Sequence, residues 1–357
     1  MPFSRTRYSA AWRVAVVGVG LGAVACSSNP DAEKAAVPLP TGHYEGPITY
    51  QGTELRVALE LREPQPGQLQ AEISFPQLPE LTFVPSQALY QAPQLRLVSS
   101  PESAGSVSVQ AVREGDFLRG VLSWDSLQAD FVWVRRGQAA PLGFREQALG
   151  GSSELRLLLP DDTLPRHRAL VLLASPATAS AAAQRARYLA RHGVAALVLP
   201  TASLGPDSVG GPAVAAVLAR LRRHPSLDSG KVGYWGRGSI TRLLAAAAAQ
   251  RPRPAFAVLE GAPADTRTEA EPYAIFNRLR IPVLALYAGL DTTVLTREST
   301  RRLRAALGYR PATQVRIVPQ VTPDFVQPGR TRADGQWEWP QPAAGYWSGM
   351  LEWVQRR

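Results

Sequence analysis

The 357-residue chain contains one cysteine, two methionines and four histidines, and its only lysines are Lys34 and Lys231. A lone cysteine excludes an intramolecular disulfide and a cysteine-rich zinc site. Neither His-x-x-x-His nor Cys-x-x-Cys spacing occurs, so the sequence predicts no metal and no cofactor. The formal charge is +10, but the arginines are spread along the chain, often beside acidic residues. Nucleic-acid binding requires clustered basic residues, so we expect no nucleic-acid partner and interpret the arginines as solvated.

The N-terminus has three arginines followed by a short apolar run, Val14–Ala25. This run is too short for a mature membrane span and is typical of a secretory signal peptide. The single cysteine, Cys26, follows "LGAVA" directly, and polar residues come next. The pattern resembles a bacterial lipoprotein signal, apart from Ala23 where leucine is usual, and implies cleavage before Cys26 and diacylation of Cys26. The alternative is an ordinary signal peptide with an incidental cysteine.

These features predict a signal peptide over residues 1–25 and a tether over 26–40. The lipid anchor would attach the protein to a membrane of the bacterial cell envelope, on the periplasmic or outer-membrane side. The membrane is therefore one expected partner.

Residues 41–137 alternate apolar and polar side chains in short segments separated by turn residues. The segments are 54–61, 70–75, 94–100, 106–112, 117–124 and 129–134. Strands with one solvated face have this pattern, which predicts a small antiparallel β-sandwich or barrel domain. The region contains His43 but no cluster of His, Cys and carboxylates, so we expect no chemistry in it.

Residues 138–153 are rich in small residues and predict a linker. Beyond them, residues 154–357 contain nearly continuous apolar runs at 169–175, 194–201, 231–236, 256–261, 282–289 and 314–320. Helix-like stretches separate the runs, and an amphipathic helix closes the chain. Strands buried on both faces and alternating with helices predict a mostly parallel sheet flanked by helices.

The stretch "LRRHPSLDSGKVGYWGRGS" at 221–239 has a helix ending in L-x-x-H-P, a short loop, and then a strand leading into a glycine-rich turn. It resembles the nucleophile region of secreted bacterial serine hydrolases, and residues 150–357 resemble the α/β-hydrolase superfamily as a whole. That fold places the nucleophile on a strained strand-to-helix turn, with an acid and a histidine after later strands. The resemblance assigns these positions to Gly238, Asp291 and Pro323.

Only the acid survives among these three positions. Glycine has no nucleophilic side chain, and no histidine follows the turn. Ser239 is the fallback nucleophile, but Arg237 and Thr241 would then occupy positions where the tight turn needs small residues. We therefore interpret Ser239 as an early helix residue whose hydroxyl caps backbone amides.

Two further elements of a hydrolase site are absent. Pro176 stands where the family's oxyanion turn is expected, and proline has no N–H to donate. The lid segment is shortened to 261–281, which predicts little material for a substrate pocket. Losing triad members costs a serine protease about 10⁴- to 10⁶-fold in rate.

The sequence thus favours an envelope-anchored α/β-hydrolase-like lipoprotein that is catalytically inactive and acts by binding an unidentified small molecule or protein, or by scaffolding. The alternative is an active serine hydrolase, of esterase or peptidase type, that uses Ser239. A third hypothesis makes the N-terminal β domain the ligand-binding module.

Overall fold

The computed structural model describes residues 38–99, 107–149, 155–204 and 207–357. The predicted signal peptide, Cys26 and nearly all of the predicted tether lie outside the described residues. No helix among the described residues is long and apolar enough to cross a membrane.

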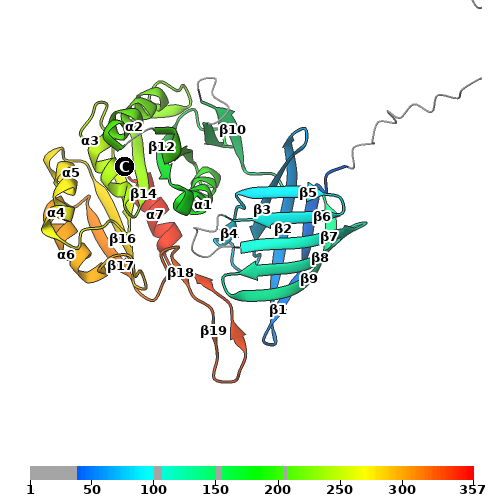
Figure 1. Cartoon of the computed structure of the whole chain (residues 1–357). Coiled ribbons are helices and arrows are strands. Elements are labelled where there is room, and N and C mark those ends of the chain that lie inside the picture. Colours follow the sequence, from blue (N-terminus) through cyan, green and yellow to red (C-terminus); the bar gives the residue numbers. More distant parts are fainter. Residues whose placement is uncertain (1–37, 100–106, 150–154, 205–206) are drawn as a thin grey trace, which may run out of the picture. The chain divides into compact units, whose positions relative to one another are not determined.

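The first half of the chain forms one antiparallel sheet, called sheet A, which curls so that β3 and β5 come into contact (Figure 1). Its strands alternate as expected: Val107, Val109 and Ala111 of β7 are buried, whereas the residues between them are more exposed. The predicted antiparallel β region is therefore present, as a single curled sheet and not as two packed sheets. The strand order is β4 (Thr82–Phe83), β3 (Gln68–Ser74), β2 (Thr53–Gln65), β1 (Gly42–Tyr50), β9 (Leu127–Gly137), β8 (Phe117–Trp124), β7 (Val107–Glu114), β6 (Gln94–Val98) and β5 (Gln87–Gln91).

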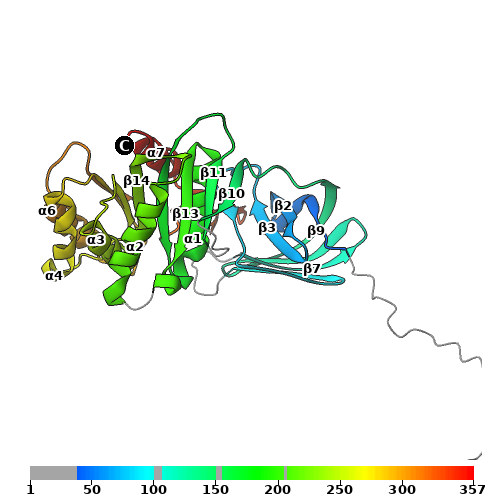
Figure 2. The same cartoon turned by 90° about the horizontal axis from the view of Figure 1, so that it is seen from above.

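The second half forms a mixed sheet, called sheet B, with helices on both faces (Figure 2). Six neighbouring strands are parallel and coincide with the six apolar runs. The edge strand β10 pairs antiparallel with β11, which in turn pairs antiparallel with β13. Strand β10 lies inside the segment that we interpreted as a linker. The order is β10 (Phe144–Ala148), β11 (Arg156–Pro160), β13 (Val194–Pro200), β12 (His167–Ala174), β14 (Leu227–Arg237), β15 (Ala257–Glu260), β16 (Val283–Ala288) and β17 (Gln314–Val318).

Successive side chains of β12 point to opposite faces of sheet B, and each face has its own apolar layer. Leu170 and Leu172 pack with the helices α1 and α7, whereas Val171 and Leu173 pack with α2, α3 and α6. Each layer is apolar, so both faces of the sheet must be covered. The helices are α1 (Ala179–Arg191), α2 (Asp207–Leu221), α3 (Ile240–Ala248), α4 (Arg267–Ala270), α5 (Ala274–Arg278), α6 (Thr296–Leu307) and α7 (Tyr346–Gln355).

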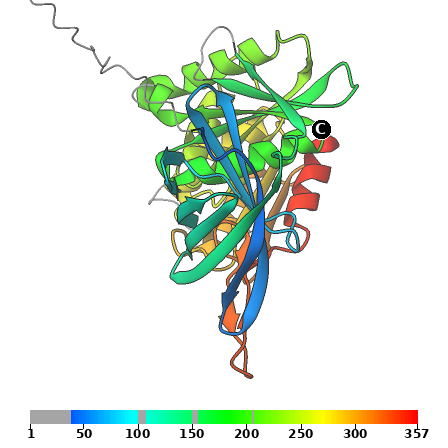
Figure 3. The same ribbon diagram turned by 90° about the vertical axis from the view of Figure 1, so that its right-hand side faces the viewer.

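Between β17 and α7 the chain leaves sheet B and packs against sheet A. This C-terminal segment carries four short strands: β18 (Val326–Gln327), β19 (Arg330–Thr331), β20 (Trp337–Glu338) and β21 (Gln341–Pro342). Trp339 is buried in the core of sheet A, where its ring stacks on Trp124 with 6.4 Å between centroids. The segment also reaches the β1–β2 turn, where Thr331 Oγ1 donates a hydrogen bond of 2.9 Å to Gln51 Oε1 (Figure 3).

Ion pairs connect sheet A to helix α1. Glu72 of β3 accepts hydrogen bonds from Arg187 (2.7 Å) and from Arg191 (2.6 Å). Arg187 is only 6% exposed and Arg185, on the same helix, is fully buried. Our interpretation of the arginines as solvated is thus wrong for these two residues, because buried carboxylates neutralise their charges. Both sheets belong to one compact unit, Leu39–Arg357.

Candidate functional site

The turn between β14 and α3 has the backbone expected of a nucleophile position. Gly238 has φ +61°, in the left-handed region that glycine adopts at little cost. Its N–H donates to the carbonyl of Glu260 at 2.8 Å, which ties the turn to the end of β15. A Cβ at this position would meet no atom within 4 Å. The turn therefore has room for a side chain that the sequence does not supply.

Ser239 is the residue that precedes the first turn of α3. Its backbone is helical, with φ −60° and ψ −26°, and its side chain makes no capping hydrogen bond. The position agrees with our expectation of an early helix residue, but the expected cap is absent. Thr241 Oγ1 instead donates to the carbonyl of Gly238 at 2.6 Å, so the neighbouring threonine stabilises the turn.

The other two predicted positions lie at the same edge of sheet B, in the loops that follow β16 and β17. Asp291 Oδ1 accepts hydrogen bonds from the N–H (2.8 Å) and the hydroxyl (2.6 Å) of Thr293, within its own loop. Asp291 Oδ2 lies 3.1 Å from where a Cβ on Gly261 would stand, at the end of β15. Pro323 precedes Asp324 in the loop after β17. The topology thus brings Gly238, Asp291 and Pro323 to one edge, with no imidazole among them.

None of the four histidines lies at this edge. His167 begins β12, His192 caps the end of α1 before β13, and His224 precedes β14. These three residues lie at the amino ends of the parallel strands, whereas the three predicted positions lie at the carboxyl ends. His43 belongs to β1 of sheet A, where its ring nitrogens contact Glu60 (2.7 Å) and Glu45 (2.8 Å).

A buried cluster of charges surrounds the turn instead. Glu260, at the end of β15, is 1% exposed. Its Oε1 accepts from Arg185 Nε at 3.0 Å and from Trp235 Nε1 at 2.9 Å, and it also accepts from the hydroxyl of Tyr346. Its Oε2 accepts from Arg237 Nε (3.3 Å) and Nη2 (3.2 Å). We call these residues, together with Asp324, the Glu260 cluster.

The remaining contacts complete this cluster. Arg237 Nη1 donates to Asp324 Oδ1, so one guanidinium bridges two carboxylates. The Arg185 guanidinium lies 5.4 Å from the ring centroids of Trp235, Tyr346 and Trp347, within cation–π range. Two arginines and two acids balance in formal charge.

The cluster shifts the pKa values of Glu260, Arg237 and Tyr346. Burial by itself would raise the pKa of Glu260, but the charges of Arg185 and Arg237 and the donated hydrogen bonds hold that pKa below its ordinary value. Burial also disfavours the charged form of Arg237, yet Asp324 and Glu260 together raise its pKa. Burial raises the pKa of the Tyr346 hydroxyl well above its usual range. Arg237 and Tyr346 are therefore already protonated near neutral pH, and Glu260, whose two oxygens accept hydrogen bonds from the cluster, is a weak general base.

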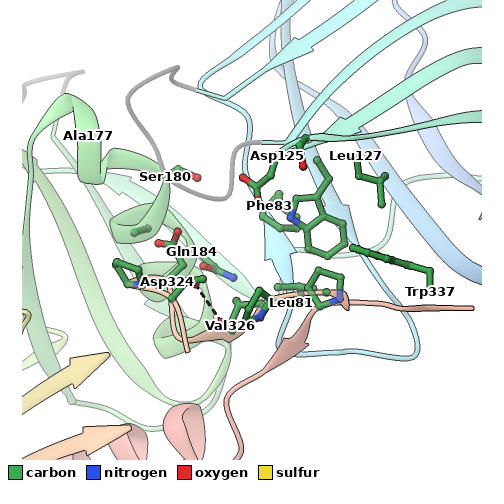
Figure 4. A pocket seen from close by; sticks show the side chains of 18 residues that line it. Leu81, Phe83, Asp125, Leu127, Ala177, Ser180, Gln184, Asp324, Val326 and Trp337 are labelled. Atoms are coloured by element: carbon green, nitrogen blue, oxygen red, sulfur yellow. Dashed lines mark hydrogen bonds between the residues drawn. The ribbon is translucent and has the colours of Figure 1, made fainter. Parts of the chain in front are cut away.

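A pocket of about 430 Å³ opens beside this edge (Figure 4). Its size falls within the range of small-molecule sites. Sheet A and the chain around it contribute Phe83, Trp124 and Asp125, the start of α1 contributes Ser180 and Gln184, and the C-terminal segment contributes Pro323, Asp324 and Trp337.

This pocket differs from one of our expectations. The shortened lid predicted little material for a pocket. Sheet A and the C-terminal segment instead supply the wall that the lid segment does not. Pro323 is the one predicted site residue that lines the pocket. Among the described residues, no group of His, Cys, Asp and Glu could hold a metal ion.

Neither a family model nor a curated protein matches the chain. Among solved structures, the chain is similar to a dienelactone hydrolase from Anabaena variabilis (17% identity, 60% of this chain and 98% of that chain, TM-score 0.42). It is also similar to a cold-adapted esterase from an Arctic intertidal metagenomic library (15% identity, 69% and 96%, TM-score 0.39). A third is the AtxE2 isopeptidase in its apo form (12% identity, 84% and 60%, TM-score 0.43). The dienelactone hydrolase and the esterase are α/β-hydrolase-fold enzymes.

Sequence reasoning missed Glu260, Asp324 and Arg185. One signal was available: Glu260 is a lone carboxylate that directly follows the apolar run "AVL" of a buried strand. A charge at that place needs a partner. Arg237 was noticed only as a steric obstacle to Ser239, although it is one of the two arginines that pair with that carboxylate.

Proposed function

We propose that this protein is a hydrolase-like binding protein without hydrolytic activity. The observation that carries the proposal is the turn at Gly238, which keeps the positive φ of a nucleophile position but has no side chain there. Arg237 and Glu260 next to the turn are engaged with each other, and no imidazole lies at this edge of the sheet. A serine at this turn would therefore have no base to accept its proton.

Binding is favoured over a purely structural role because a pocket of about 430 Å³ lies at the same edge of sheet B, where its lining residue Asp324 contacts Arg237. Its lining combines aromatic rings with a few polar side chains, as small-molecule sites do. Sheet A forms part of the wall, so the proposal joins the hydrolase-like half and the β region in one binding site.

We further propose that the protein acts at the bacterial cell envelope, anchored through a diacylated Cys26. Two acyl chains give stable membrane attachment where a single chain gives reversible attachment. In fractionation of the producing cell, the wild-type chain should sediment with membranes and Cys26→Ser should be soluble. A wild-type chain found in the soluble fraction would contradict the anchor but not the binding function.

The lack of hydrolysis is tested with a fluorophosphonate probe, which labels only an activated serine, and with p-nitrophenyl esters. Wild type and Gly238→Ser should both be unlabelled and inactive. Gly238→Ser should also lower the free energy of unfolding by about 1 kcal/mol, because serine is strained at this φ. Gly238→Ser combined with Pro323→His restores three triad residue types with Asp291 and is the variant in which weak labelling is expected.

Ser239→Ala is the matched control for the alternative. Labelling of the wild type that disappears in Ser239→Ala would make the protein a serine hydrolase and overturn the proposal. Labelling that persists in Ser239→Ala would report a serine elsewhere and would equally contradict it.

A further inference from the structure

The charges beside the pocket are already compensated. Its described lining residues include two carboxylates, Asp125 and Asp324, and no arginine, lysine or histidine. Asp324 is paired with Arg237, and Asp125 is solvent-exposed and has an interaction of its own. A charged ligand would lose water on entering the pocket without gaining a free counter-charge, which is costly. The lining therefore favours a ligand without net charge.

Two aromatic rings of the pocket wall are accessible to a ligand. Phe83 and Trp337 line the pocket and are half-buried, so each ring keeps part of its surface free. Phe83 is fixed by an edge-to-face contact with Trp124, and Trp337 by one with Tyr50, both with 5.2 Å between ring centroids. Aliphatic side chains and prolines also line the pocket. Aromatic rings pack favourably against other rings, so this wall favours an aromatic group on the ligand.

Helix α1 supplies two polar side chains to the pocket, Ser180 and Gln184. Figure 4 shows them on the α1 side, with Phe83 and Trp337 on the other side. Both are half-buried, and neither side chain makes a hydrogen bond with another described residue. The amide of glutamine has one acceptor oxygen and two N–H donors. Gln184 can therefore bind a ligand group that both donates and accepts hydrogen bonds.

We propose that the pocket binds an uncharged aromatic compound that carries an amide or a similar group with both a donor and an acceptor. The ring of the ligand packs against Phe83 and Trp337, and the amide group binds Gln184. This inference rests on the proposed binding function and deepens it by naming the ligand class.

The test is isothermal titration calorimetry of the full chain with three probes of similar size: 3-phenylpropanamide, 3-phenylpropionate and 3-phenylpropylamine. At neutral pH these probes are uncharged, anionic and cationic. The amide should bind at least about fivefold more tightly than either ion, because only the ions must bury a charge. Toluene, which has the ring without a polar group, is the fourth probe.

Gln184→Leu tests the polar contact, because leucine has a similar size but no hydrogen-bonding group. The variant should weaken binding of the amide about three- to tenfold, as expected for one hydrogen bond, and should not weaken binding of toluene. Gln110→Leu, at an exposed position of β7 outside the pocket lining, is the matched control and should change neither affinity. Trp337→Leu should instead weaken the amide and toluene alike, since both probes carry the ring.

The outcomes separate this inference from the proposed function. Binding of either ion as tightly as the amide would overturn the inference and leave a binding protein of another specificity. An equal loss of amide and toluene affinity in Gln184→Leu would overturn the contact assigned to Gln184. Absence of binding by all four probes would overturn the inference and count against the pocket as a binding site. Fluorophosphonate labelling at Ser239 would overturn the non-hydrolytic function whatever the calorimetry shows.

Discussion

Two buried glutamates in this protein are each held by two arginines, but the two ion-pair clusters lie in different parts of the fold. Glu260 lies inside the hydrolase-like half, where tryptophan and tyrosine donors join Arg185 and Arg237. Glu72 lies on sheet A and is held by Arg187 and Arg191 of α1. The first cluster lies beside the turn between β14 and α3 at the carboxyl ends of the parallel strands, and the second joins sheet A to a helix of sheet B.

The two clusters differ in how far their charged side chains are exposed to water. The side chains of Glu260 and Arg185 are 1% and 0% exposed, whereas Arg191 in the second cluster is 29% exposed. A fully enclosed ion pair loses all its hydration and depends on its partners, while a partly exposed arginine can be rehydrated. We therefore expect the two clusters to respond unequally to the same substitution.

The largest effect is expected from Glu260→Gln. The substitution leaves Arg185 without a counter-charge in the interior, and breaking one partner of a buried ion pair typically costs about 3–5 kcal/mol. Urea unfolding measures the loss. Glu114→Gln, which breaks the exposed pair with Arg119, is the control and should cost no more than about 1 kcal/mol. A Glu260→Gln variant as stable as this control would show that the cluster contributes little to folding.

The fold was largely predictable because burial of apolar strands leaves a periodic signal in the sequence. The six parallel strands of sheet B are nearly continuous apolar runs, and sheet A alternates. Strand β10 was not predicted because of its five residues only Phe144 is buried and its neighbours have the small-residue composition of a linker. Its place in the sheet depends on pairing with β11, which is a tertiary contact.

The candidate site was predictable only where the local sequence requires a particular backbone conformation. The positive φ of Gly238 follows from its place in the turn motif. The Glu260 cluster does not, because Arg185 and Tyr346 lie 75 and 86 residues from Glu260 in the sequence. An arginine within "AAQRARYLARHG" has the same appearance whether water or a distant carboxylate solvates it.

A smaller effect is expected from Glu72→Gln, about 2 kcal/mol, because Arg191 can turn to solvent when its partner is lost. The two variants should also differ in which elements of the fold they destabilise. Hydrogen exchange should accelerate in β3 and α1 in Glu72→Gln, and in β14 and β15 in Glu260→Gln.

A double-mutant cycle tests the pair of Glu72 with Arg187. Glu72→Gln and Arg187→Gln combined in one protein should cost less free energy of unfolding than the sum of the two single costs. Additive costs would mean that the ion pair carries no net stability.

The smallest expected effect is the difference in acid sensitivity between the wild type and Glu72→Gln. Burial would raise the pKa of Glu72, but the charges and hydrogen bonds of Arg187 and Arg191 hold it below the ordinary value of 4.5. A carboxylate whose pKa is lower in the folded state stabilises the fold above about pH 4.5, and this contribution is lost as pH falls through the folded pKa. The free energy of unfolding should therefore fall less steeply below pH 4.5 in Glu72→Gln than in the wild type. Part of the slope should remain, because the pKa of Glu260 is also lowered. Parallel curves for the two proteins would indicate that Glu72 ionises equally in the folded and unfolded chain, and that the link between sheet A and α1 does not depend on its charge.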